Sequence, residues 1–116
     1  MDTNETKMIS FSLLERLELH EILPKKESRV VLVVLKDLKK KLELTQEEIS
    51  KFQIKDTILP NGRNGISLNN DGVNYTKEIE ITKLEKDVIS SLFNKLDETK
   101  ELPESLLNID QQISSN

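Results

Sequence analysis

The chain has 116 residues, of which 35% are hydrophobic and 33% are charged, and its formal net charge is −4. This length suits one domain with one hydrophobic core. The core must be aliphatic, because the chain has only three phenylalanines and one tyrosine. The negative charge gives no overall attraction to nucleic acid or to anionic membranes. Without cysteine there can be no disulfide, thiolate metal site or cysteine nucleophile, and the single histidine, His20, excludes a multi-histidine metal site within one chain.

The N-terminal segment is polar and has no apolar stretch of the kind that forms a signal peptide. The longest unbroken apolar run, Val30–Leu35, is much shorter than the roughly 20 residues that span a membrane. We therefore expect a cytoplasmic protein without a membrane partner. Residues 1–8 and 114–116 are expected to be flexible tails on either side of a single α+β domain at residues 9–113.

A first helix is predicted over residues 12–23. Ser12 and Glu15 have the spacing of a capping box, in which each side chain binds a backbone N–H of the other residue. Pro24 then ends the helix. Three leucines form its expected buried face: Leu13, Leu14 and Leu17.

A second helix is predicted over residues 28–43. The run Val30–Leu35 is also compatible with a buried strand, since β-branched residues favour sheets. An apolar stripe at helical spacing nevertheless continues to Leu38 and Leu42, which favours the helix.

A third, short helix is predicted over residues 45–51, because Thr45 and Glu48 form another capping box. With the preceding helix, this segment resembles the start of a repressor-type helix-turn-helix at residues 35–59. Such a motif needs a second helix to enter the major groove. Here Gln53 stands where the turn usually has glycine, and Pro60 would interrupt the recognition helix. DNA binding is therefore kept as the alternative function.

A small antiparallel sheet of two or three strands is predicted between residues 52 and 81, where apolar and polar residues alternate. The dipeptides Asn64-Gly65 and Asp71-Gly72 are predicted to form its hairpin turns, because these residues tolerate positive φ.

Residues 67–78 have the spacing of a calcium loop, with glycine at the sixth position and glutamate at the twelfth. The first position is Ser67 and not a carboxylate, so a hairpin turn is favoured and no metal or cofactor is expected. A catalytic imidazole needs an orienting partner and usually a nucleophile, and His20 has no evident triad around it. We therefore expect a protein that is not an enzyme and has no catalytic residues.

A long helix over residues 82–99 is predicted from a third capping box, Thr82 with Glu85, and a broad apolar stripe. A last helix is predicted over residues 103–112. The expected core pairs one side of the long helix with the second helix, through Leu84, Val88, Leu92, Leu96, Val31, Leu35 and Leu38. Ile89 and Phe93, on the other side of the stripe, are then candidates for self-association into a homodimer.

Cations gather near the second helix, and the candidate partner-binding patch consists of Lys25, Lys26, Arg29, Lys36, Lys39, Lys40 and Lys41. The alternative is a solvated helix face stabilised by pairs such as Asp37 with Lys40 and Lys41. Acidic residues gather at 97–110, so the two charged ends of neighbouring copies could also attract each other.

Three segments, Leu44-Thr45-Gln46-Glu47-Glu48, Phe52-Gln53-Ile54-Lys55 and Lys77-Glu78-Ile79-Glu80-Ile81, precede the long amphipathic helix. With that helix, the order of elements over residues 9–113 resembles small uncharacterised proteins encoded by phages and prophages. This resemblance implies the cytoplasm of a bacterial host and an accessory or assembly role. The sequence thus predicts amphipathic helices packed on a small sheet, in a non-enzymatic module that binds a protein partner or itself, with nucleic acid an unfavoured partner.

Overall fold

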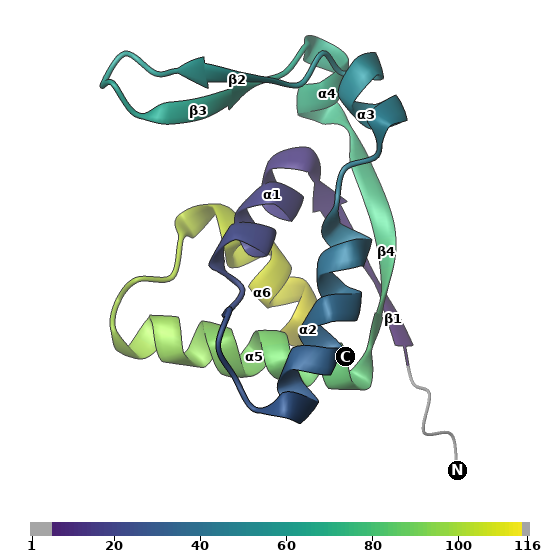
Figure 1. Ribbon diagram of the computed structural model, residues 1–116, viewed down its shortest axis with the longest axis vertical. Helices are drawn as coiled ribbons and strands as arrows, with labels where there is room; N and C mark the ends of the chain where they lie inside the picture. Colours follow the sequence, from purple (N-terminus) through teal and green to yellow (C-terminus); the bar gives the residue numbers. More distant parts are fainter. Residues whose placement is uncertain (1–5, 115–116) are drawn as a thin grey trace.

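The computed structural model describes residues 6–114 and has the predicted α+β fold, built from short strands and amphipathic helices (Figure 1). In chain order the elements are β1 (Thr6–Ser12), α1 (Leu13–Ile22), α2 (Arg29–Leu42), α3 (Gln46–Lys51), β2 (Lys55–Ile58), β3 (Asn64–Ser67), α4 (Asn70–Asn74), β4 (Thr76–Thr82), α5 (Lys83–Glu98), a 3₁₀ turn η1 (Glu104–Leu106) and α6 (Leu107–Ser114).

The predicted starts of the first, second, third and long helices are confirmed, whereas the helix predicted at 103–112 begins with the 3₁₀ turn Glu104–Leu106 and becomes α-helical only at Leu107. Ser12, Thr45 and Thr82 each accept a hydrogen bond from the backbone N–H three residues later, and the glutamate at that position binds the N–H of the cap. Ser28 caps α2 with its side chain alone. These starts are fixed locally, because each cap satisfies backbone donors that the first helical turn leaves unpaired.

The strands differ from the prediction, because they form two separate two-stranded sheets. β1 pairs antiparallel with β4, so that Ile9 lies opposite Ile79. The expected tail at residues 1–8 is therefore wrong for Thr6–Met8, which belong to β1, and Ser114 is the last residue of α6. Residues 1–5 and 115–116 of the expected tails lie outside the described residues.

Side chains cover both outer edges of the β1–β4 ribbon. The side-chain amide of Gln112 on α6 accepts a hydrogen bond from the Ser10 N–H at 2.8 Å and donates one to the Ser10 carbonyl at 2.9 Å. On the other edge, Lys41 Nζ donates to the Glu80 carbonyl at 2.9 Å. These contacts use backbone groups that would otherwise be free to pair with another strand.

The second sheet is the hairpin β2–β3, which projects at the end of the molecule opposite α5 (Figure 1). Its loop turns at Gly62, with φ of 83°, and the Gly62 N–H donates to the Leu59 carbonyl. Both predicted turns are wrong: Asn64-Gly65 belongs to β3, and Asp71-Gly72 belongs to α4, which Asn69 caps. Within residues 67–78, the chain therefore forms the short helix α4 and neither a hairpin turn nor a calcium loop.

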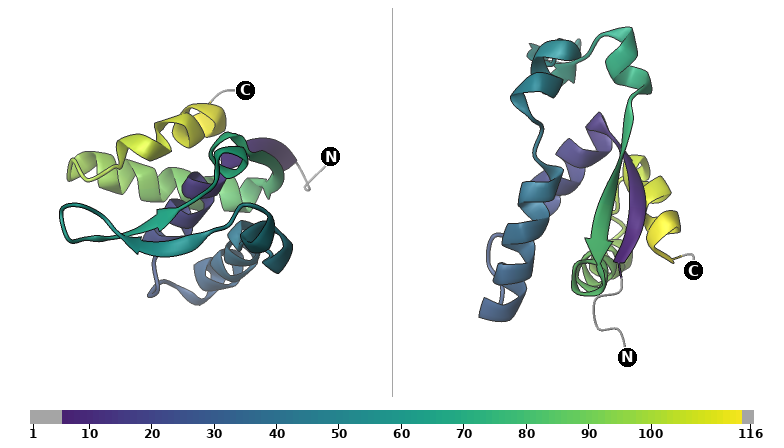
Figure 2. Two further views of the ribbon diagram at one scale, coloured as in Figure 1. Left: turned by 90° about the horizontal axis from the view of Figure 1, so that it is seen from above. Right: turned by 90° about the vertical axis from the view of Figure 1, so that its right-hand side faces the viewer.

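The hydrophobic core lies between the inner face of the β1–β4 ribbon and the helices α1, α2, α5 and α6. In Figure 2 α2 forms one outer side of the molecule, and α6 lies beside the ribbon on the other. Most core side chains are aliphatic, as the composition predicts, and Phe11 and Phe93 are among the exceptions. The strands contribute Ile9, Phe11, Ile79 and Ile81.

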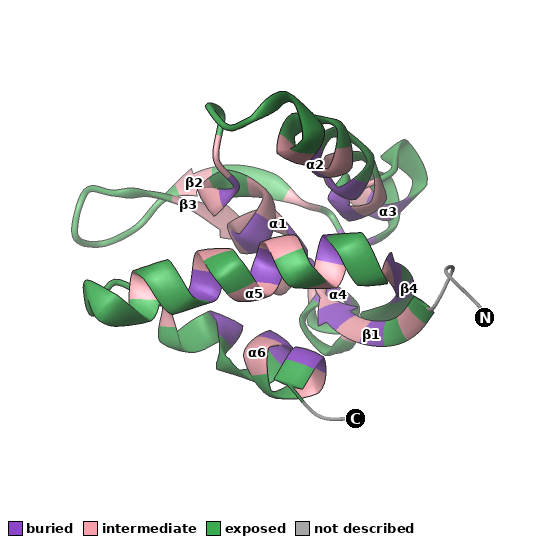
Figure 3. Cartoon of the chain, turned by 90° about the horizontal axis from the view of Figure 1, so that it is seen from below, coloured by how far each residue is buried: buried purple, intermediate pink, exposed green. Residues whose placement is uncertain are grey.

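The predicted packing of α5 on α2 is partly confirmed, since Leu35 and Leu38 are buried and Val88 and Leu92 pack half-buried against the core. The predicted orientation of α5 is wrong, and so is the proposal that Ile89 and Phe93 mediate self-association. Both residues are core residues, 0% and 2% exposed, whereas Leu84 is 63% exposed (Figure 3). The helix is rotated relative to the prediction because Glu85 is buried. Its carboxylate is satisfied by the Thr82 N–H at 2.9 Å and by Lys41 Nζ at 2.6 Å, so a charged residue can lie on the core side.

The predicted face of α1 is also corrected, since Leu14 is exposed and Arg16 is buried. Arg16 donates to both carboxylate oxygens of Glu48 at 2.7 and 3.0 Å, and to the Glu43 carbonyl at 2.7 Å. The cap of α3 and the interior face of α1 therefore share one carboxylate, which fixes α3 against α1.

Candidate functional site

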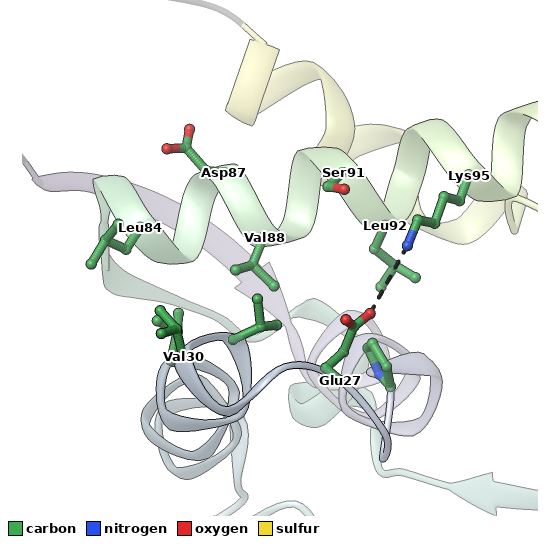
Figure 4. A pocket seen from close by; sticks show the side chains of 11 residues that line it. Glu27, Val30, Leu84, Asp87, Val88, Ser91, Leu92 and Lys95 are labelled. Carbon is green, nitrogen blue, oxygen red and sulfur yellow. Dashed lines mark ion pairs between the residues drawn. The ribbon is translucent and has the colours of Figure 1, made fainter.

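An apolar groove opens between α5, the first turns of α2 and the connection that precedes α2 (Figure 4). Its volume is about 470 Å³, within the range of about 300–1,000 Å³ that is usual for binding pockets. Its lining residues are Pro24, Glu27, Val30, Val31, Val34, Leu84, Asp87, Val88, Ser91, Leu92 and Lys95. We call this the α2–α5 groove.

The α2 side of the groove comes from Val30, Val31 and Val34, which belong to an apolar run that also includes Leu32 and Val33. The core face of α2 lies further along the helix, at Leu35, Leu38 and Leu42. The first turns therefore extend past the core, and Val30 is 74% exposed and Val33 61% exposed. A helix that is apolar on all sides is normally covered by other protein. Here the chain itself leaves much of that surface uncovered.

The α5 side consists of Leu84, Val88 and Leu92, one helical turn apart from each other. These residues face the groove because the opposite side of α5 is held in the core by Ile89 and Phe93. The groove thus contains four of the side chains that the sequence predicts for the core, Val31, Leu84, Val88 and Leu92.

Polar groups lie at the rim of the groove. Lys95 Nζ and Glu27 Oε2 are 3.9 Å apart and connect α5 to the segment before α2 at one end (Figure 4). Asp87 and Ser91, both on α5, also line the groove. An apolar floor with a few polar groups at its edge is the composition of protein-binding surfaces.

The predicted cationic patch is largely exposed, and none of its residues lines the groove. Lys25 and Lys26 precede α2, and Arg29, Lys36 and Lys40 are exposed on the helix. None of these five forms an ion pair among residues 6–114.

Two predicted members of the patch behave differently. Lys39 is half-buried. Lys41 contacts Glu85 and the Glu80 carbonyl, so its charge stabilises the packing of α2 on α5 and β4. The ion pairs expected between Asp37 and Lys40 or Lys41 do not form within the described part of the chain. The cations of α2 are therefore not neutralised by neighbours on their own helix.

A second cavity, of about 460 Å³, lies between α1, the α2–α3 connection and the base of the β2–β3 hairpin. His20 lines it together with Glu43, Lys55 and Asp56, and its other lining residues are aliphatic. No hydroxyl or thiol group is among the residues lining this cavity. The arrangement thus brings His20 close to carboxylates without the nucleophile that a catalytic triad requires.

A smaller polar cavity, of about 250 Å³, lies next to the Arg16–Glu48 pair and includes Lys51, Tyr75 and Lys77 in its lining. Burial raises the pKa of the Glu48 carboxyl, but its hydrogen bonds from Arg16 and the Thr45 N–H, with the Arg16 charge, outweigh burial and lower the pKa from 4.5 to about 2. Burial and the Glu48 charge raise the pKa of the Tyr75 hydroxyl. The Arg16–Glu48 pair could not be predicted from the sequence, because its two members are 32 residues apart.

The alternative DNA-binding motif at residues 35–59 does not have the helix-turn-helix geometry. α2 and α3 are present, but Lys55–Ile58 forms strand β2 where the recognition helix would begin. Gln53 takes the left-handed conformation, with φ of 51°, and ends α3. No helix is therefore available at this point to enter a major groove.

Residues 6–114 include no group of three or more histidine, cysteine, aspartate or glutamate side chains placed to hold a metal ion. Among these residues there is likewise no helix that is both long and apolar enough to cross a membrane. Comparisons with protein-family models, with curated proteins and with solved structures found no match.

Proposed function

We propose that the protein is a non-enzymatic protein-binding module and that the α2–α5 groove is its binding surface. The observation that carries the proposal is the exposed apolar surface of Val30 at the start of α2 and of Leu84 across the groove, which are 74% and 63% exposed. Contiguous exposed apolar surface of this kind is typical of interaction sites, whereas single exposed apolar residues are ordinary. An accessory or assembly role, as implied by the resemblance to phage and prophage proteins, would use such a surface.

The groove suits a helix of the partner. Two helices that cross leave a concave apolar corner, and an amphipathic helix can place its apolar face into it through residues one turn apart. A second copy of this chain remains an alternative occupant. A homodimer cannot use Ile89 or Phe93, because those two residues are already buried in the core.

Affinity capture from a lysate of the native host tests the proposal with four baits. These are the wild-type protein, Val30→Asp, Leu84→Asp and the control Val73→Asp. Leu84 and Val73 are each 63% exposed, but Val73 lies on α4, away from the groove. All three substitutions should change the free energy of unfolding by less than about 0.5 kcal/mol, as is usual at exposed positions.

We expect the wild-type protein and Val73→Asp to retain the same partner, and the two groove variants to lose it. Retention of the same proteins by all four baits, or of none by any bait, contradicts the proposal. Sedimentation velocity of the same four proteins identifies self-association, because a homodimer through the groove would dissociate only in the groove variants.

A further inference from the structure

We propose that the α2–α5 groove receives the tip of the β2–β3 hairpin from a second copy of this chain, so that two copies associate by tip-to-groove contacts. This inference rests on the proposed function, because it names the occupant of the same groove and the segment that enters it. We call residues 58–64 the hairpin tip.

The hairpin tip is apolar where it is most exposed. It begins with three consecutive apolar residues, Ile58, Leu59 and Pro60. Ile58 is 75% exposed and Leu59 is 40% exposed, and Pro60 is exposed as well. Runs of three or more exposed apolar residues are unusual on a folded chain unless they serve a function. The tip is therefore a second apolar surface that the fold leaves uncovered.

The backbone of the tip is ordered by contacts within the hairpin. The Leu59 N–H donates to the Arg63 carbonyl at 2.8 Å, and the Gly62 N–H donates to the Leu59 carbonyl at 2.8 Å. Asn61 Oδ1 accepts a hydrogen bond from the Arg63 N–H at 3.0 Å. The Leu59 side chain lies over Gly65, where a Cβ would be 2.7 Å from Leu59 Cδ2. A segment that is already ordered loses little conformational freedom when it binds.

The groove offers two apolar walls to this tip. Its aliphatic lining comes from α2 on one side and from α5 on the other (Figure 4): Val30, Val31 and Val34, and Leu84, Val88 and Leu92. Consecutive side chains of an extended segment point in opposite directions. A tip that enters between the two helices therefore presents Ile58 to one wall and Leu59 to the other.

The charges of the two surfaces are complementary. Arg63 is the only charged residue of the hairpin tip, and it forms no ion pair among residues 6–114. The charged residues that line the groove are Glu27, Asp87 and Lys95. Lys95 already lies 3.9 Å from Glu27, whereas Asp87 has no ion pair within the described part of the chain. The tip thus brings an unpaired cation to a rim with an unpaired carboxylate, which favours this match.

The tip and the groove lie at opposite ends of a molecule 47 Å long. The hairpin projects at one end, and the groove lies at the other, between α5 and the first turns of α2 (Figure 1). The tip therefore cannot cover the groove of its own chain. An antiparallel pair of copies brings each tip to the groove of the other copy, so the contact forms twice and the assembly closes as a two-fold dimer.

Other occupants match these surfaces less well. A groove-to-groove dimer would place the unpaired Asp87 carboxylates of both copies in one interface, which is unfavourable, and would leave Ile58 uncovered. A helix of another protein would cover the groove but would also leave the tip exposed. A second copy that contributes its hairpin tip covers both apolar surfaces at once.

Sedimentation velocity of the full chain at 10–500 μM tests the inference with Leu84→Asp in the groove, Ile58→Asp at the tip and the control Val73→Asp on α4. We expect the wild type and the control to form dimers and each of the other two variants to be monomeric alone. A 1:1 mixture of Leu84→Asp and Ile58→Asp should associate, because the intact tip of the first fits the intact groove of the second.

Three outcomes overturn the inference. The first is a wild type that stays monomeric up to 500 μM. The second is a dimer of Ile58→Asp alone, which would indicate a groove-to-groove contact. The third is a mixture of the two variants that remains as monomeric as each variant alone.

A charge exchange tests the pairing of Arg63 with Asp87. Arg63→Glu and Asp87→Arg should each raise the dimer Kd at least about tenfold, because each places like charges together, and the double variant should return to within about threefold of the wild type. A double variant as weak as the single variants contradicts the inference.

The two proposals fail differently. If Leu84→Asp loses a captured partner, Ile58→Asp keeps it and the wild type is monomeric, the groove binds another protein and only the second copy is wrong. If neither capture nor self-association depends on the groove, the proposed function itself is wrong.

Discussion

The buried pair of Arg16 and Glu48 makes the stability of the protein depend on pH in a way that one substitution can isolate. The pKa of the Glu48 carboxyl is about 2 in the folded chain, compared with 4.5 for the ordinary group. This difference corresponds to about 3 kcal/mol of folding free energy. Because the folded-state pKa is lowered, that stability is fully present above about pH 4.5 and is lost as the pH falls toward 2.

The perturbation is Glu48→Gln, which keeps the shape of the side chain but removes its charge. Arg16 is 0% exposed and would then be a buried cation without a counter-charge, at a cost of about 3–5 kcal/mol. Urea denaturation of both proteins at several pH values between 2 and 7 measures the effect. We expect the variant to be less stable by about 3 kcal/mol at pH 7, and the difference to shrink below about 1 kcal/mol near pH 2.

The control is Glu47→Gln, since Glu47 is exposed and makes no ion pair among residues 6–114. It should change the unfolding free energy by less than about 0.5 kcal/mol at every pH. A difference between wild type and Glu48→Gln that stays constant from pH 7 to pH 2 would refute the assignment of the acid-sensitive stability to this carboxylate.

Two further predictions concern packing and backbone conformation. Phe93→Ala should destabilise the fold by about 3–5 kcal/mol, because it leaves a cavity in the core, whereas Leu84→Ala on the same helix should cost less than about 0.5 kcal/mol. Urea denaturation measures both, and similar losses of unfolding free energy would contradict the observed orientation of α5. Gln53→Gly should raise the unfolding free energy by up to about 1 kcal/mol, because Gln53 ends α3 with φ of 51°, a conformation that glycine adopts more easily. A lower melting temperature of the variant in a thermal melt would contradict strain at this position.

The sequence predicts the helices well because their starts are encoded locally. A hydroxyl followed three residues later by glutamate is sufficient to specify where α1, α3 and α5 begin, and all three boxes form. The strands were harder to predict because their pairing is not local. β1 has the alternation of Ile9 and Phe11, but it is short, and its partner β4 lies about 70 residues further along the chain, in the register that pairs Ile9 with Ile79.

The buried faces of the helices could not be predicted from hydrophobicity alone, because two of them contain charge. Arg16 on α1 and Glu85 on α5 are buried, and each forms an ion pair with a partner from a distant part of the sequence. A pattern of apolar residues treats both positions as solvent-facing and so rotates each helix away from its true orientation. For α5 this rotation moves Leu84 out of the predicted core and moves Ile89 and Phe93 into it, which is why the apolar pattern alone predicts self-association through those two residues.

The polar contacts inside the fold contrast with the exposed beginning of α2. Lys41 is bound by Glu85, and the buried Arg16 side chain makes three hydrogen bonds through its terminal nitrogens, two of them to Glu48. The charged groups of the interior therefore have partners of opposite charge. At the beginning of α2, by contrast, Val30 is 74% exposed and Val33 61% exposed, and Arg29 makes no ion pair within residues 6–114. Because the fold pairs its buried charges but leaves these apolar side chains at the surface, they are the part of the chain best suited to contact a partner.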